Sequence, residues 1–305
     1  VNWLKQRGFV SPNGSSFVAP VRLQSPKDGV LVVQRIILDE RIVEAAKRVG
    51  AFFKDNTSVR WTEYSQTEQM WSIHVNGPKG FEKTIKCHAL VAADGASSYI
   101  ARSLNIVKTK PNGIAGRSII KAGSHECRAD ELFFYSKYIA GAGHAHIAKE
   151  VGNFLNFTCF LVSGDSKPAP KVETLVHVYD TLKTRDLSVK KVLGASVDCS
   201  QFKMASLRCG GVPKSYGHAC LVVGEAAGQV DPLTGHGIHL GMEGAKIAAD
   251  TLERAFKLND FSEEQLKLYQ KKWKSKMNRD FYWSRFIVDL ATYQSKHFSL
   301  NGRYF

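Results

Sequence analysis

The chain has 305 residues, of which 44% are hydrophobic and 23% are charged, a balance that is typical of folded globular proteins and excludes a mostly disordered chain. No apolar run approaches the roughly 18 residues that a membrane-spanning helix needs. The formal net charge of +14 favours encounter with an anionic membrane or an acidic protein partner, whereas nucleic acid is disfavoured because the basic residues are scattered rather than clustered among aromatic residues.

Residues 1–30 are rich in glycine, proline and serine, which predicts loops and short strands. The first residue is Val1, so we expect sequence upstream of it. Residues 31–53 read as an apolar strand followed by a helix, with Asp39 as the N-cap and Gly50 as the residue that ends the helix.

Two segments with alternating apolar residues, 70–77 and 81–91, are predicted to form a β-hairpin around a Gly-Pro-Lys-Gly turn. The second segment continues into a buried strand that delivers Asp94 and Gly95 at its carboxyl end. In open α/β sheets this is the edge at which ligands bind.

Residues 106–215 show little helical periodicity, so we predict a β-rich second domain, with helices at residues 172–184 and 186–195. Small-residue α/β character returns near residue 218, and helices are predicted from Phe261 onward. The expected organisation is therefore a discontinuous α/β domain (residues 1–105 and 216–258), a β-rich substrate domain (106–215) and a C-terminal helical segment (259–305).

Residues 219–252 carry the strongest chemical signal. A short apolar strand ends at Gly224-Glu225, and a tight loop from Pro232 to Gly237 leads into a helix that begins at Ile238. Glycines just before a helix expose backbone N–H groups, and the helix N-terminus adds a partial positive charge, so such a loop can hold a carbonyl or a developing anion. Small residues also permit a plain strand–loop–helix connection, which is the alternative.

Six cysteines show no C-x-x-C pair and no metal-ligand spacing. We therefore expect no metal site, and thiols that are mostly buried in a reducing intracellular compartment. They are Cys87, Cys127, Cys159, Cys199, Cys209 and Cys220.

Three motifs in this order resemble the p-hydroxybenzoate hydroxylase-like superfamily of FAD-dependent oxidoreductases. They are Arg35 with Leu38-Asp39, Asp94-Gly95-Ala96-Ser97-Ser98 with Arg102, and Gly224-Glu225-Ala226-Ala227-Gly228 followed by Pro232-Leu233-Thr234-Gly235-His236-Gly237-Ile238. The last of these is most similar to the geranylgeranyl reductase-like branch. The resemblance implies an α/β fold, with a Rossmann-like FAD-binding domain, a β-sheet substrate domain and C-terminal helices.

The resemblance also assigns cofactor-binding positions. It implies that residue 225 bonds the ribityl chain of FAD, although this chain has Glu225 where the family has Asp, and that the loop before the helix lies beside the flavin ring. The positions implied are Arg35, Asp94, Gly95, Gly224, Glu225, Pro232, Thr234, Gly235, His236, Gly237 and Ile238. Without the resemblance, Arg35 reads as a surface ion-pair partner and Asp94 as a helix cap.

One family element is missing from this sequence. No Gly-x-Gly-x-x-Gly turn precedes Leu31, so the FAD-binding domain is incomplete at its N-terminus. Either residues upstream of Val1 supply this turn, or the protein descends from a flavoprotein and no longer uses FAD.

Two further segments bear on the substrate and on partners. His144 and His146 stand where reductases carry an aromatic-rich pocket segment, so that aromatic character is expected to be lost. As neighbours on one strand face, the two histidines could be substrate-pocket acid–base groups, half of a metal site, or ordinary strand residues. The segment 266–293 combines lysines with aromatic residues and could either lie on an anionic membrane or pack its aromatic side chains on the core.

The reading that the resemblance favours is an FAD-dependent oxidoreductase that reduces carbon–carbon double bonds of an isoprenoid or other apolar substrate. NAD(P)H or a partner protein would supply the electrons, and no side chain is assigned as a catalytic acid or base. Two alternatives stay open: a flavin monooxygenase of an aromatic or polyene substrate, and a non-catalytic subunit that keeps the fold as a scaffold within a larger complex.

Overall fold

The computed structural model of the chain describes residues 2–21, 31–121, 129–139, 142–164, 169–195, 197–198 and 200–300. The chain divides into two units, one made of residues 1–45, 112–206 and 286–305, and the other of residues 46–111 and 207–285. None of the helices in the described part combines the length and the apolar content that a bilayer crossing requires.

The first unit is built on an eight-stranded sheet with the order β13-β9-β12-β11-β10-β2-β3, in which β14 also pairs with β9. A separate two-stranded sheet pairs β1 (Asn2–Trp3) with β4 (Leu31–Val32). The strands of the large sheet are β2 (Gln6–Val10), β3 (Ser16–Pro20), β9 (Gly113–Lys121), β10 (Glu131–Phe134), β11 (Ala142–Glu150), β12 (Phe154–Val162), β13 (Val197–Asp198) and β14 (Lys203–Leu207).

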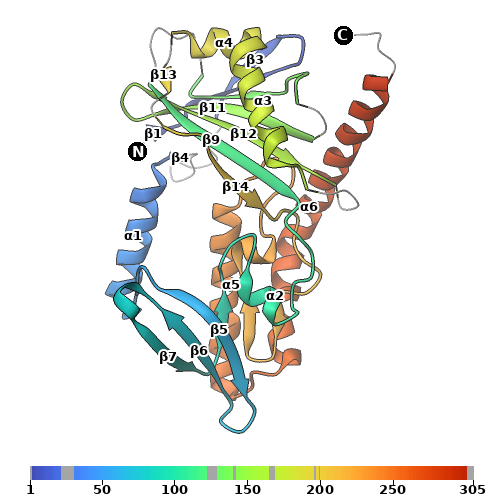
Figure 1. The fold of residues 1–305 in the computed structure, drawn as a ribbon. Helices are drawn as coiled ribbons and strands as arrows, with labels where there is room; N and C mark the ends of the chain where they lie inside the picture. Colours follow the sequence, from blue (N-terminus) through green and yellow to red (C-terminus); the bar gives the residue numbers. More distant parts are fainter. Residues whose placement is uncertain are drawn as a thin grey trace. The chain divides into compact units, whose positions relative to one another are not determined.

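Two helices cover one face of this sheet, α3 (Val172–Arg185) and α4 (Leu187–Leu193) (Figure 1). Leu175, Leu182 and Val189 from the helices pack on Ile147 and Phe157 from the strands to form its hydrophobic core. Both helices, and the β-rich character of this part of the chain, are as predicted.

The second unit contains two small sheets. β5 (Ser58–Ser65), β6 (Met70–Asn76) and β7 (Glu82–Cys87) form an antiparallel meander, and β15 (Tyr216–Gly217), β16 (Cys220–Val222) and β8 (Leu90–Ala92) form the other sheet. The predicted hairpin is confirmed, but its second segment divides between the two sheets after Cys87. Trp71 joins the sheets, because its indole N–H donates to the carbonyl of Ala219 at 2.8 Å.

Three helices complete this unit: α2 (Tyr99–Ser103), α5 (Ile238–Leu258) and the first part of α6 (Glu263–Leu300) (Figure 1). Leu266, Tyr269 and Trp273 of α6 are fully buried against Leu221 of β16 and Ile247 of α5. The C-terminal region is therefore one long helix whose first half belongs to the α/β unit, rather than the separate helical segment that was predicted.

The observed division of the chain also differs from the expected one at the N-terminus. β2 pairs in parallel with β10, with Arg7 opposite Glu131 and Val10 opposite Phe134. Backbone hydrogen bonds thus place residues 6–20 in the β-rich unit, although their loop-like composition had grouped them with residues 31–105. Pairing between distant strands is not visible in local composition.

Helix α1 (Arg35–Arg48) begins earlier than predicted. Asp39 lies inside the helix, one turn after Arg35, and the two side chains form an exposed ion pair at 3.1 Å. The prediction of Asp39 as N-cap is therefore wrong: its carboxylate serves an i,i+4 pair instead of the helix terminus.

Candidate functional site

Two parallel strands of the second unit end at the same edge. Leu90, Val91 and Ala92 of β8 pair with Cys220, Leu221 and Val222 of β16, and Val223 N donates to Ala92 O at 2.9 Å. The chain then leaves β8 through Asp94-Gly95 and β16 through Gly224-Glu225. Two of the predicted motifs are thereby brought together at the carboxyl ends of neighbouring strands, where ligands bind in α/β proteins.

Asp94 holds the loop after β8 in place. Its carboxylate accepts hydrogen bonds from Ser98 Oγ at 2.5 Å and from Ile100 N at 3.1 Å, and Ser98 is the N-cap of α2 through Ala101 N. Asp94 thus accepts an N–H of the first turn of α2, in keeping with the helix-capping interpretation, although Ser98 is the N-cap itself. Gly95 beside it has φ +79° and open space where a Cβ would stand.

Arg208, which was not predicted as a site residue, holds the same loop by hydrogen bonds. Its buried guanidinium donates twice to Ala96 O, at 2.9 and 3.1 Å, and to the carbonyl and hydroxyl of Thr109 at 2.7 Å each. Burial, and then Arg102, lower the pKa of Arg208, against the opposing effect of Glu225. The partly buried carboxylate of Glu225 therefore interacts electrostatically with the buried guanidinium of Arg208.

The turn after β16 is closed by a buried side chain, Gln229. Gly224 N donates to Gln229 Oε1 at 2.8 Å, and Gln229 N donates back to Gly224 O at 3.0 Å. Gln229 Nε2 donates to the hydroxyl of Tyr269 at 2.9 Å, which in turn donates to Val222 O at 2.9 Å. This chain of bonds fixes the glycine turn to both β16 and α6, and neither Gln229 nor Tyr269 was predicted.

Gly224 itself is open toward solvent. Its φ is +65°, and a Cβ added to it would meet no atom within 4 Å. It shares both properties with Gly95 at the end of β8. The two strand ends therefore offer bare backbone at the shared edge, a shape that suits close approach of a ligand.

Asp231 organises the loop that precedes α5. One oxygen of its carboxylate accepts from Leu233 N, Thr234 N and Thr234 Oγ1 at 2.8–3.0 Å, and the other accepts from Ser284 Oγ at 2.6 Å. The hydroxyl of Thr234 is thus committed to the loop itself. An Asp followed by Pro two residues before Thr is an ordinary turn signal, which could have pointed to this role.

The loop from Pro232 to Gly237 is held by backbone hydrogen bonds and ends at the N-terminus of α5. Gly235 N donates to Asp231 O and Asp231 N to His236 O, both at 2.9 Å, while Pro232 is buried and His236 is exposed. A Cβ on Gly237 would lie 2.6 Å from Val230 Cγ2, so any larger residue there would force one of the two to move. The backbone of the predicted loop is therefore held rigid by contacts on its inner side.

Helix α5 begins next to the glycine turn. The first hydrogen bond of its backbone runs from Gly241 N to Gly237 O at 2.7 Å, and a Cβ on Gly241 would lie 3.6 Å from Gly224 Cα. The N–H groups of the first turn point away from the helix body, where its macrodipole is positive. Bare glycine backbone and a helix N-terminus thus adjoin, and this arrangement can stabilise an anionic group.

The other three predicted residues lie in the first unit. Arg35 lies on α1 with its side chain half exposed and paired to Asp39, as in the surface ion-pair reading. His144 and His146 lie on β11 in the β-rich unit.

The two histidines stand in an aromatic face of the large sheet. His144 is buried, with ring centroids 5.4 Å from Phe133 and from Phe160, and His146 lies 5.5 Å from Phe133. Tyr135 is 6.2 Å from His144, and burial raises its pKa. The aromatic side chains around the two histidines thus come from β10 and β12, which the sequence of β11 alone did not reveal.

No group of three or more potential metal ligands occurs among the described residues. The described residues therefore offer no third ligand to a metal ion bound by His144 and His146.

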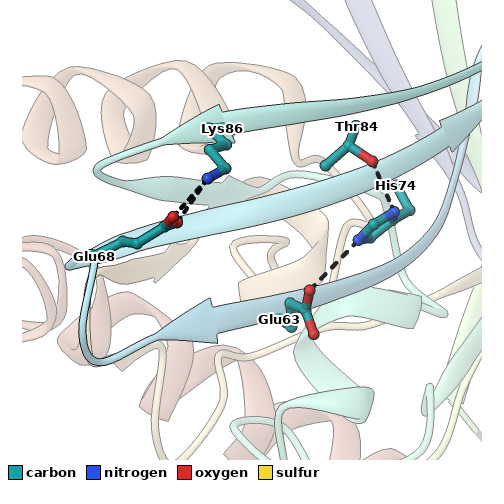
Figure 2. A network of polar contacts seen from close by, with 5 residues as sticks. All are labelled: Glu63, Glu68, His74, Thr84 and Lys86. Carbon is teal, nitrogen blue, oxygen red and sulfur yellow. Dashed lines mark hydrogen bonds and ion pairs between the residues drawn. The ribbon is translucent and has the colours of Figure 1, made fainter.

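A set of polar contacts lies on the three-stranded meander of β5, β6 and β7 (Figure 2). His74 Nδ1 is 2.9 Å from Thr84 Oγ1, and His74 Nε2 is 3.7 Å from Glu63 Oε1, while Lys86 pairs with Glu68 at 2.7 Å. The imidazole also stacks on the ring of Trp61. Partly exposed pairs of this kind add little stability each, and they tie the three strands together.

This chain is similar in sequence to a known protein family and to several named proteins. A family model described as "FAD binding domain" matches residues 13–275. Conditioned medium factor receptor 1 from Dictyostelium discoideum is 36% identical over 91% of this chain and 55% of its own length. Digeranylgeranylglycerophospholipid reductase from Methanocaldococcus jannaschii is 31% identical over 90% of this chain and 67% of its own length. The chain therefore spans about half to two thirds of the length of these relatives.

Solved structures share the fold at low identity. A geranylgeranyl bacteriochlorophyll reductase-like protein from Thermoplasma acidophilum superposes with a TM-score of 0.80 at 16% identity, over 95% of this chain and 72% of its own. A flavin-dependent brominase gives a TM-score of 0.75 at 13% identity, over 98% and 73% of the two chains. At these identities the likeness concerns the fold alone.

Proposed function

The chain belongs to the FAD-binding-domain family, and from this premise we propose that it is an FAD-dependent oxidoreductase that reduces carbon–carbon double bonds of an isoprenoid lipid. The observation that carries the proposal is the contact between Gly224 and the first turn of α5, with bare glycine backbone at both strand ends. The named activity of the archaeal relative supports the substrate class.

The residues at the strand ends fit a flavin. Gly95 and Gly224 both leave open the space that a Cβ would fill, and the N-terminus of α5 supplies donors to a group that becomes negatively charged on reduction. When bound, FAD would supply the hydride chemistry. We assign Glu225 to the ribityl hydroxyls, and the loop from Pro232 to Ile238 to the edge of the flavin ring.

The protein would orient and enclose the reactants. Asp94 and Arg208 hold the loop after β8, while Asp231 and Gln229 hold the loops beside α5, so that the donors are in place before the cofactor arrives. We assign the apolar substrate to the β-rich unit, where Phe133, Phe160 and the two histidines form an aromatic cluster that is largely buried in this structure. NAD(P)H or a partner protein would re-reduce the flavin.

A second candidate, a non-catalytic protein of the same fold, is supported by two observations. The relative that is 36% identical is named a receptor, and this chain has Glu225 in place of the family's Asp. In this reading the fold would serve as a scaffold or as a subunit of a larger complex.

We also place the protein in a reducing compartment inside the cell. Four described cysteines, Cys87, Cys159, Cys209 and Cys220, are free thiols, and three of them are buried. Free thiols are the usual state in such compartments.

Flavin content tests the proposal most simply. The protein purified from its native source should carry stoichiometric FAD, visible in its absorbance and released on denaturation. A protein that arrives without flavin and fails to bind added FAD would overturn the oxidoreductase and leave the scaffold.

A further inference from the structure

The long helix α6 exposes a second apolar face in addition to its buried one. Its inner face carries Trp273 and Phe281, which are 0% and 3% exposed, and the amine of Lys274 lies along Trp273 and donates to Pro213 O. Packing on the core, one of the two readings of this segment, thus applies to these residues. The outward side chains differ: Tyr282, Trp283, Phe286, Ile287 and Leu290 are 64%, 57%, 53%, 44% and 46% exposed.

Cations continue this exposed face toward the N-terminus of the helix. Lys272, Lys276, Arg279, Trp283, Phe286 and Leu290 follow one another at intervals of three or four residues, so they lie along one side of the helix. Lys276 pairs with Glu243 of α5. Arg279 is 87% exposed and lies 3.7 Å from the neighbouring carboxylate of Asp280. We call Lys272, Lys276, Arg279, Tyr282, Trp283, Phe286, Ile287 and Leu290 the basic–aromatic face.

The chemistry of this face selects one kind of partner. We propose that the basic–aromatic face binds an anionic lipid surface, with the aromatic side chains among the headgroups and the cations on lipid phosphates. Trp and Tyr favour membrane interfaces, and an interfacial helix combines an apolar side with Lys and Arg. The net charge of +14 attracts the whole chain to such a surface.

A second copy of the chain is a poorer fit to the same face. Two copies in parallel would oppose Lys272 and Arg279 to their own counterparts, and two antiparallel copies would oppose these cations to apolar side chains. The residues that define the face include no acid, and the carboxylates beside it, Glu243 and Asp280, already lie next to Lys276 and Arg279, so neither arrangement supplies a carboxylate from within the face. Phosphate groups of lipids supply the missing negative charge.

Vesicle co-sedimentation of the purified protein tests the inference. Vesicles of phosphatidylcholine with one third phosphatidylglycerol should bind the protein at least tenfold more tightly than vesicles of phosphatidylcholine alone, and salt should weaken the binding. The double variant Lys272→Glu/Arg279→Glu should lose this preference. Trp283→Ala/Phe286→Ala should weaken binding to anionic vesicles about tenfold.

A matched control removes apolar surface elsewhere. Ile36 and Phe52 are 77% and 89% exposed, and Ile36→Ala/Phe52→Ala should leave vesicle binding unchanged. Equal binding to both vesicle types, or equal losses in the control and the α6 variants, would overturn the inference. So would a Trp283→Ala/Phe286→Ala variant whose one change is a smaller oligomer in sedimentation, because the face would then join copies of the chain. Vesicle binding needs no flavin, so this test is independent of the proposed reaction.

Discussion

A Cβ on Gly244 would lie 2.0 Å from Oε1 of Gln229, the same oxygen that accepts the hydrogen bond from Gly224 N. Helix α5 therefore packs directly on the side chain that closes the glycine turn. The position of the helix N-terminus and the conformation of the turn are determined together.

The close packing of Gly244 on Gln229 predicts that a methyl group added at position 244 lowers stability. Gly244→Ala should lower the free energy of unfolding by about 2 kcal/mol, because overpacking displaces a buried hydrogen-bonded amide. Gly241→Ala is the matched control: its Cβ would be in ordinary contact at 3.6 Å, and alanine raises helix propensity by up to ~1 kcal/mol. Urea denaturation of the two flavin-free variants measures both effects, and equal destabilisation would contradict the packing described for α5.

Alanine variants of Gly224 and Gly80 distinguish the effect of backbone strain from an effect on FAD binding. Both have positive φ and open space around the missing Cβ, but Gly80 lies in the turn between β6 and β7. Alanine at either position should cost about 1 kcal/mol of stability through left-handed strain. Gly224→Ala should in addition weaken FAD binding at least tenfold, measured by fluorescence titration. If Gly80→Ala weakens FAD equally, the glycine turn is not the flavin site.

Asp231 should matter more than its partner Ser284. Asp231→Ala leaves the amides of Leu233 and Thr234 without their acceptor, so we expect a loss of about 2–3 kcal/mol, against about 1 kcal/mol for Ser284→Ala, which removes a single bond. Thermal unfolding of both variants measures the difference. Similar losses would mean that the carboxylate does not organise the loop.

The described thiols should differ in reactivity. Burial raises the pKa of Cys87 and of Cys159, and it raises that of Cys220 to about 12, with Asp94 and Cys87 adding to the effect. A raised pKa lowers the thiolate fraction at neutral pH, so alkylation should be slow and should accelerate as pH rises. Cys87, which is half-buried, should react first in peptide mass mapping. Earlier labelling of Cys159 or Cys220 would contradict the burial described.

His144 tests the role of the aromatic face. His144→Phe keeps a ring of similar size among Phe133 and Phe160, so stability should change by less than about 1 kcal/mol, and kcat should change less than threefold. Steady-state kinetics with an isoprenoid substrate checks the second expectation. A large fall in kcat with unchanged KM would instead make His144 an acid–base group.

Local patterns in the sequence predicted the elements that local chemistry controls. The helices α3 and α4, the hairpin of β6 and β7, and the glycine loop before Ile238 follow from periodicity and turn residues, and the α/β fold class with its FAD-binding unit is confirmed. The start of α1 was misplaced, because Asp39 suits a cap and an i,i+4 pair equally well.

The supports of the site could not be predicted, because they come from distant segments. Arg208 reaches Thr109 across a separation of 99 residues, and Gln229 reaches Tyr269 across 40. Each is one polar residue without a periodic pattern around it. Their roles follow only from the pairing of β8 with β16 and from the packing of α6.

We propose that this protein uses bound flavin to reduce an isoprenoid double bond. The most direct test is an anaerobic experiment in which the flavin of the purified protein is first reduced chemically and a lipid with geranylgeranyl chains is then added. We predict that the absorbance of oxidised flavin returns without oxygen, and that the lipid gains two hydrogens for each flavin reoxidised. A protein whose flavin stays reduced in the presence of the lipid, and is reoxidised by oxygen alone, would contradict the account.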